Sequence, residues 1–141
     1  MNAVLTAMTG LLHQRPLIFV HMLAAVTALL LGAWILSRRK GTSEHRAFGR
    51  TWALAMGLAT VTSAFILDKG LPNIHGFTPI HALTVLVAVQ LPRGIWHIRQ
   101  GNVAAHRKTM KSIYIGGCII AGFFTLMPSR FLGDLLWHKI L

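Results

Sequence analysis

Four long apolar runs dominate the sequence, and they constrain the fold more than any other feature. The runs cover approximately residues 16–36, 51–67, 79–98 and 112–132. Each is close to the roughly 20 residues that an α-helix needs to cross a bilayer. The second run is short, but its helix can begin near Thr42 or Ser43. The runs lack the alternation of a strand, and only helices or closed barrels satisfy their backbone in lipid. They therefore predict an all-α, polytopic membrane protein with a bundle of four transmembrane helices.

The composition supports a membrane protein and argues against a nucleic-acid binder. Of the 141 residues, 54% are hydrophobic and 12% are charged, whereas a soluble domain carries about 25% charged residues. The net charge is +11, but the basic residues cluster between the apolar runs instead of covering one soluble face. The length predicts a single domain, residues 1–141. The single cysteine, Cys118, excludes an intrachain disulfide. Residues 1–12 lack the basic start of a signal peptide, which predicts a retained N-terminal segment.

The basic residues also predict how the helices are oriented. Ten of the 14 lie in or beside two of the connections between the runs: Arg38, Arg39, Lys40, Arg46 and Arg50, then Arg93, Arg99, Arg107, Lys108 and Lys111. The other four are Arg15, Lys69, Arg130 and Lys139. By the positive-inside rule, the two basic connections face the cytoplasm and both chain termini lie outside.

An internal repeat divides the chain into two helical hairpins. His21 lies near the start of the first run, and a His-Arg pair beginning at His45 opens the second. His81 and the pair beginning at His106 occupy the matching places in the second half. The separations are 24 and 25 positions, so a single-residue gap aligns the two copies. Fixed internal spacing of this kind predicts a repeated structural unit.

The predicted hairpins cover residues 16–67 and 79–132, and their turns should be tight. Helix C-terminal caps are expected at Gly41 and Gly101. N-terminal caps of the helices that follow are expected at Thr42 and Asn102, and Thr78 is expected to cap the third helix.

Each hairpin places one histidine near each membrane face. His21 and His81 are expected at similar depth near the outer face, and His45 and His106 near the inner face. If helices one and three are diagonal in the bundle, and two and four likewise, each level offers two imidazoles from facing helices. Such a pair suits the axial positions of haem iron. Haem propionates need cations. The candidates are Arg38, Arg46, Arg93 and Arg107 on the inner side, and Arg15, Lys69 and Arg130 on the outer side.

Other interpretations of the same residues stay open. His45 and His106 lie near the water interface and also suit plain headgroup-level residues. A transporter or channel for protons or metal ions also uses histidines, and a non-catalytic membrane subunit needs them only for packing. The three carboxylates, Glu44, Asp68 and Asp134, sit at predicted interfaces, so hydrolytic chemistry is not expected.

The remaining histidines have no counterpart in the repeat: His13, His75, His97 and His138. The tryptophans fall near predicted helix ends and suit interface anchors: Trp34, Trp52, Trp96 and Trp137.

Several motifs resemble a bacterial family of predicted four-helix membrane proteins, domain of unknown function 2306. They are Lys40-Gly41 followed by His45-Arg46-x-x-Gly49-Arg50, then Gly76-Phe77-Thr78-Pro79-Ile80-His81, then Gly101-Asn102 followed by His106-Arg107, and finally Gly116-Gly117 with Ala121-Gly122-Phe123-Phe124-Thr125-Leu126-x-Pro128-x-Arg130. This resemblance covers nearly the whole chain after Pro16 and implies a multi-pass protein of the bacterial inner membrane.

The layout of helices and histidines also resembles the four-helix core of cytochrome b561-type transmembrane haem proteins. That resemblance implies two haem b groups, one held by His21 and His81 and one by His45 and His106. It implies a membrane oxidoreductase or electron carrier that exchanges electrons with quinone or a redox partner protein. The chain departs from that family in lacking flanking helices and a recognisable ascorbate-site motif.

Overall fold

The computed structural model describes residues 2–66, 75, 78–128, 130, 133–134 and 137, and this part of the chain is helical without strands. The helices are α1 (Asn2–Gln14), α2 (Pro16–Ser37), α3 (Ser43–Phe65), α4 (Ile80–Arg99), α5 (Val103–Ile113), the π-helix η1 (Tyr114–Ile120) and α6 (Ala121–Thr125). The prediction of an all-α bundle is confirmed.

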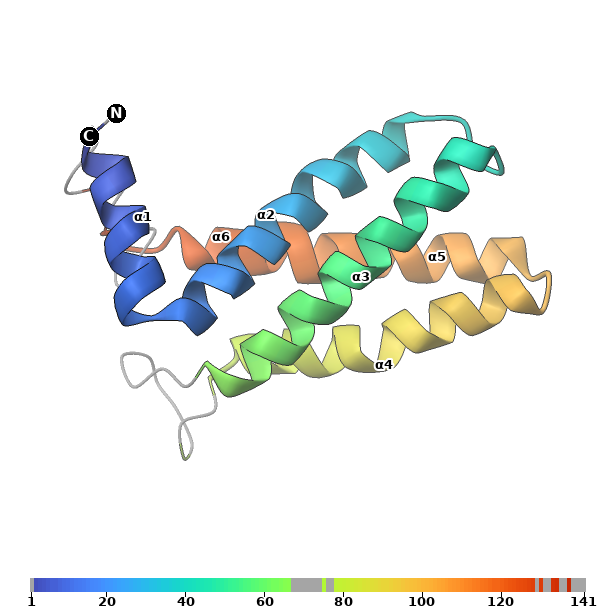
Figure 1. Ribbon diagram of the computed structural model, residues 1–141. Coiled ribbons are helices and arrows are strands. Elements are labelled where there is room, and N and C mark those ends of the chain that lie inside the picture. Colours follow the sequence, from blue (N-terminus) through green and yellow to red (C-terminus); the bar gives the residue numbers. More distant parts are fainter. Residues whose placement is uncertain are drawn as a thin grey trace.

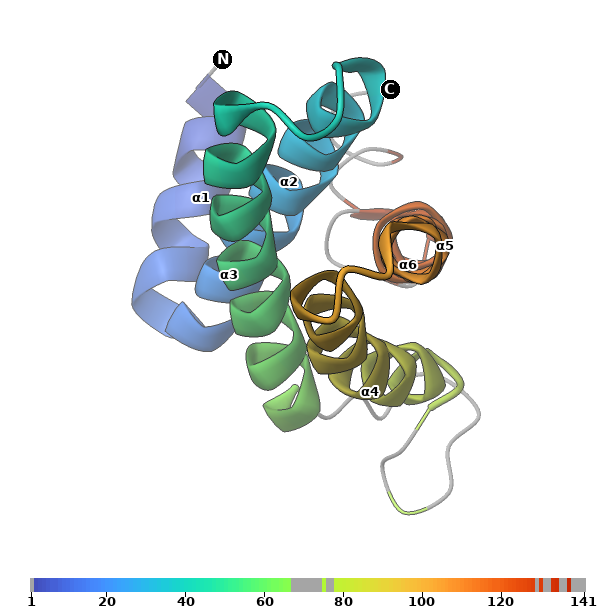
Figure 2. The same cartoon turned by 90° about the vertical axis from the view of Figure 1, so that its right-hand side faces the viewer.

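Four rods form a closed ring (Figures 1 and 2). The fourth rod consists of α5, η1 and α6, which follow one another without a break. Rod α2 contacts α3, α3 contacts α4, α4 contacts α5 and η1, and η1 closes the ring on α2. Consequently α2 is diagonal to α4, and α3 is diagonal to the fourth rod, as the haem hypothesis requires. Both hairpin turns lie at one end of the bundle, opposite α1 (Figure 1).

The fourth rod begins at Val103, directly after the predicted cap Asn102, and its described part ends at Thr125. Its first three turns are amphipathic and carry lysine and arginine, so they precede the apolar run that begins near residue 112. The π-helix coincides with Gly116 and Gly117, whose missing side chains favour departures from α geometry. The helix α1 is a further element that the sequence did not predict.

The predicted turn chemistry is confirmed at both hairpins. Gly41 and Gly101 adopt left-handed φ angles of 84° and 73°, which cost glycine little. The Thr42 hydroxyl accepts from the backbone N–H of His45 at 3.1 Å. The Asn102 side chain likewise accepts from Ala105 N–H at 3.0 Å. Each turn therefore ends one helix and caps the next within a few residues.

The outer surface of the bundle is apolar on every rod. Exposed fractions reach 66% at Leu30, 76% at Leu54, 64% at Val85 and 76% at Phe123. A soluble protein rarely leaves apolar patches of this extent in water. Of the described helices, only α2 is long and apolar enough, by length and composition, to qualify on its own as a membrane span. Rod α3 contains several glycine, alanine, serine and threonine residues, which lower its mean hydropathy.

Small residues on α2 admit two large aromatic side chains to the centre of the ring. Trp52 is 5% exposed, and its Nε1 donates to the Ala28 carbonyl at 2.9 Å. The Tyr114 hydroxyl donates to the Leu29 carbonyl at 3.2 Å. A Cβ added to Gly32 would lie 2.6 Å from the Tyr114 ring and 2.7 Å from Trp52 Nε1. The expectation that Trp52 anchors the interface is therefore wrong: it reaches the core because Gly32 leaves room.

We predict that Gly32→Ala destabilises the bundle by about 1–3 kcal/mol, because overpacking a tight core costs that much. Gly49→Ala is the matched control, since a Cβ there meets nothing within 4 Å. It should stabilise α3 by up to about 1 kcal/mol through helix propensity. Denaturation of both variants in detergent, followed by circular dichroism, measures the difference. Equal stability of the two variants would contradict the packing described here.

Candidate functional site

His21 is held between α2 and α3 near the end of the bundle that carries α1. Its Nδ1 lies 2.9 Å from the Ala59 carbonyl oxygen and 3.1 Å from the Thr62 hydroxyl oxygen. A carbonyl only accepts, so Nδ1 carries the proton. The Thr62 hydroxyl itself donates to the Leu58 carbonyl at 2.7 Å. The neutral ring of His21 therefore keeps its lone pair on Nε2, which is the form that binds a metal.

His81 has the opposite tautomer. The backbone N–H of Thr78 donates to His81 Nδ1 at 3.1 Å, so the proton of the neutral ring sits on Nε2. The backbone N–H of His81 in turn donates to the Thr78 carbonyl. The expectation that the Thr78 side chain caps this helix is wrong: the N-cap is Pro79, without a side-chain capping hydrogen bond, and the ring of His81 accepts from the Thr78 backbone instead.

His106 lies at the other end of the bundle, in the first turns of α5. Its Nδ1 lies 2.9 Å from the Gly94 carbonyl oxygen of α4, so Nδ1 donates and the Nε2 lone pair is kept. The contact depends on a close approach of α4 and α5, because a Cβ on Gly94 would collide with Met110 and Thr109. His106 therefore has the tautomer and the backbone support typical of a metal-ligating histidine.

His45 lies in the first turn of α3, at the same end of the bundle as His106. Burial lowers the pKa of His45 below its usual 6.5, and the charges of His106 and Lys40 lower it further. The Nδ1 of His45 is buried without a hydrogen-bond partner. His45 and His106 thus lie in the first turns of two diagonal rods at the turn end of the bundle.

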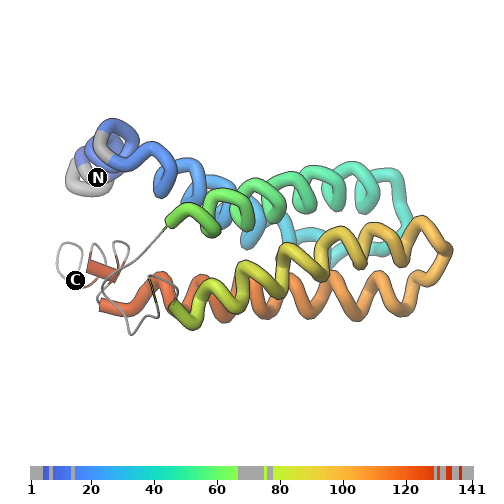
Figure 3. Tube along the Cα trace, turned by 90° about the horizontal axis from the view of Figure 1, so that it is seen from below, coloured from blue at the N-terminus to red at the C-terminus, as the bar shows by residue number. Residues whose placement is uncertain are grey.

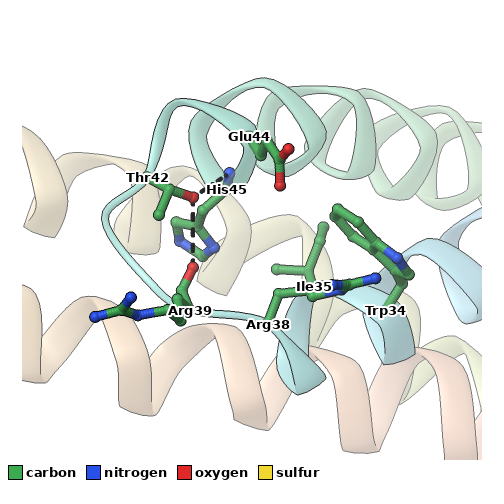
Figure 4. Close-up of a pocket in the computed structure, with 7 residues that line it drawn as sticks. All are labelled: Trp34, Ile35, Arg38, Arg39, Thr42, Glu44 and His45. Carbon is green, nitrogen blue, oxygen red and sulfur yellow. Dashed lines mark hydrogen bonds between the residues drawn. The ribbon is translucent and has the colours of Figure 1, made fainter.

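A cavity of about 160 Å³ lies beside His45, between the end of α2 and the start of α3. Its lining consists of Trp34, Ile35, Arg38, Arg39, Thr42, Glu44 and His45. Figure 4 shows the His45 ring between the two helices. The Arg38 side chain extends toward Trp34, and the Arg39 guanidinium points in the opposite direction. The guanidinium carbon of Arg38 lies 5.0 Å from the Trp34 ring centre, a cation–π contact.

The predicted arginines are distributed unevenly around this end. Arg38 lines the cavity. Arg46 Nη1 donates to the Gly41 carbonyl at 3.4 Å, so it stabilises the turn. Arg93 and Arg107 are exposed, and Arg93 directly precedes the glycine that accepts from His106. Arg39 lines the cavity although it was not among the predicted cofactor-binding residues. At the other end Arg15 is exposed and Arg130 half-buried, while Lys69 lies outside the described residues.

The inner histidines are not equivalent in the repeat. His45 is the third residue after its cap, Thr42, whereas His106 is the fourth after Asn102. The single-residue gap between the copies therefore falls between cap and histidine. One residue rotates a side chain by about 100° around a helix. This rotation lets His106 face α4 while His45 lies against the end of α2.

Sequence reasoning missed the threonine partners of the outer histidines and a hydroxyl pair that joins two rods. Thr62 and Thr78 are 6% and 4% exposed, and the Ser63 and Thr84 hydroxyls join α3 to α4 at 2.9 Å. Hydroxyl residues in otherwise apolar runs were the available signal. Of the histidines outside the repeat, His13 and His75 are exposed, His97 is half-buried, and His138 lies outside the described residues. Within the described part of the chain, no group of three or more metal-ligating side chains comes together.

Residues 18–141 match the profile of a family described as "Predicted membrane protein (DUF2306)". The chain belongs to this family. The match confirms the family resemblance of the motifs and supports a membrane location. Comparison with curated proteins found no match. Comparison with solved structures likewise found none.

We predict that the four repeat histidines differ in tautomer. Nitrogen-15 chemical shifts of histidine-labelled protein at neutral pH should show Nδ1–H at His21 and His106 and Nε2–H at His81. Assignments follow from substituting one histidine at a time. Nδ1–H at His81 would contradict its contact with the Thr78 backbone.

Proposed function

We propose that the four rods of this DUF2306 member each cross the bacterial inner membrane, with the two basic turns in the cytoplasm. The apolar outer surface of all four rods supports this topology, because lipid is the solvent that such a surface fits. The membrane-protein description of the family supports it as well. Rods α3 and α4 contain polar residues that would be costly in lipid, but several of them pair inside the bundle, as Ser63 does with Thr84.

We further propose that His45 and His106 hold one haem b at the cytoplasmic end, and that the protein carries electrons within or across the membrane. The carrying observation is that His45 and His106 lie in the first turns of two diagonal rods at the same end of the bundle, with the Nδ1–H of His106 on a backbone carbonyl. That hydrogen bond orients the His106 ring and makes its Nε2 a better donor to iron. Arg38 and Arg39 supply the positive charge that propionates need.

A haem bound there would supply reversible one-electron chemistry at its iron, and His45 and His106 would hold it. The residues of the chain orient it and set its surroundings. The cavity of about 160 Å³ is smaller than the roughly 300–1,000 Å³ of typical ligand pockets. Haem loading therefore requires the two turns to move apart. Electron exchange with quinone or a redox partner protein would take place at this end of the bundle.

The outer pair supports a second haem less well. His21 has the ligand tautomer, but the Nδ1 of His81 accepts from the Thr78 backbone, so iron binding through Nε2 would require that bond to break. A second haem held by His21 and His81 stays a prediction.

Single substitutions of the histidines test the proposal. Wild-type protein expressed with ample haem should carry about one haem per chain, and His45→Ala and His106→Ala should carry almost none. His13→Ala is the control, because His13 is exposed on α1, and it should keep full haem content. Pyridine haemochrome assays measure the ratio, and gel filtration in detergent confirms that each variant is folded.

Retention of the wild-type spectrum in both inner variants would refute the inner site. Loss of half of the haem from a two-haem protein in His21→Ala would establish the outer pair as a second site.

A further inference from the structure

Helix α1 runs across the end of the bundle and not along it (Figures 1 and 3). It contains 13 residues, which is shorter than a membrane span requires. It contacts α2, and Leu11 is buried. Only Arg15 separates this helix from the apolar rod α2. The helix α1 is therefore held at one end of the bundle.

One stripe of α1 is apolar and exposed. Leu5, Met8 and Leu12 are 56%, 38% and 46% exposed. Their spacing of three and then four residues places them on the same face of a helix. Thr6, Thr9 and His13 occupy the neighbouring polar face and are also exposed. Residues 2–14 contain no lysine, arginine, aspartate or glutamate, and Arg15 follows directly.

A short amphipathic helix that lies across the end of a spanning bundle fits the boundary between acyl chains and headgroups. If water and not lipid covered this face, three large apolar side chains would be exposed to water side by side. The spanning topology proposed above places this end of the bundle at the outer leaflet. Arg15, at the junction with α2, can then reach lipid phosphates.

We propose that α1 is an interfacial helix that docks on the outer leaflet of the bilayer through Leu5, Met8 and Leu12. This inference rests on the proposed four-span topology. The occupant of the apolar stripe is lipid, and the polar face carrying Thr6 and His13 meets headgroups and water. The helix thereby fixes the depth and tilt of the bundle at its outer end.

Depth measurements with nitroxide labels test this inference in full-length protein. The variants Leu5→Cys, Leu12→Cys and His13→Cys are made in a Cys118→Ala background and placed in nanodiscs with one chain per disc. Leu30→Cys, in the middle of α2, is the reference for the membrane interior, and Lys40→Cys is the reference for water. Collisions with oxygen report lipid, and collisions with a water-soluble nickel complex report solvent.

The labels at positions 5 and 12 should lie about 5–10 Å below the headgroup boundary, with the label at 13 in contact with nickel. If positions 5 and 12 contact nickel freely while position 30 is deep, the docking of α1 is wrong and the topology stands. If position 30 also contacts nickel, the topology fails and the inference fails with it. Protection of positions 5 and 12 from both reagents would mean that protein covers the stripe, which also overturns the inference.

Discussion

The architecture depends on how closely α2 approaches Trp52 and Tyr114. Their polar atoms donate to the carbonyls of Ala28 and Leu29, and Gly32 leaves the room for both rings. These contacts join α2 to α3 and to the fourth rod at once, so they close the ring. A membrane bundle cannot rely on the hydrophobic effect between its helices, because lipid is as apolar as the core. Close packing and interhelical hydrogen bonds take its place, and Gly32, Gly94 and Gly117 mark where side chains interlock.

With the ring closed, the order of the rods decides which histidines can meet. The diagonal of α3 and α5 carries His45 and His106 at the turn end. The diagonal of α2 and α4 carries His21 and His81, whose Nδ1 hydrogen bonds run in opposite directions. His21 donates to a carbonyl of α3, which prepares its Nε2 for a metal, whereas His81 accepts from the Thr78 backbone N–H.

The sequence was sufficient to predict the helical class, the four rods and both turn caps, and it left open which rods are diagonal. Glycine at a left-handed φ and a capping side chain are local signals, and Gly41 with Thr42 can be recognised without tertiary information. Two features could not be predicted. Trp52 is buried because of a glycine on a different helix. The roles of His21 and His81 depend on the partners of single ring nitrogens, which spacing does not reveal.

The optical and magnetic spectra of the purified wild-type protein test the central claim most directly. The account predicts that the oxidised protein shows a low-spin ferric signal and that the reduced protein shows a sharp α-band, because two imidazoles make the iron six-coordinate. A folded, colourless protein obtained from haem-replete cells would contradict the haem assignment. A high-spin signal would contradict the pairing of His45 with His106.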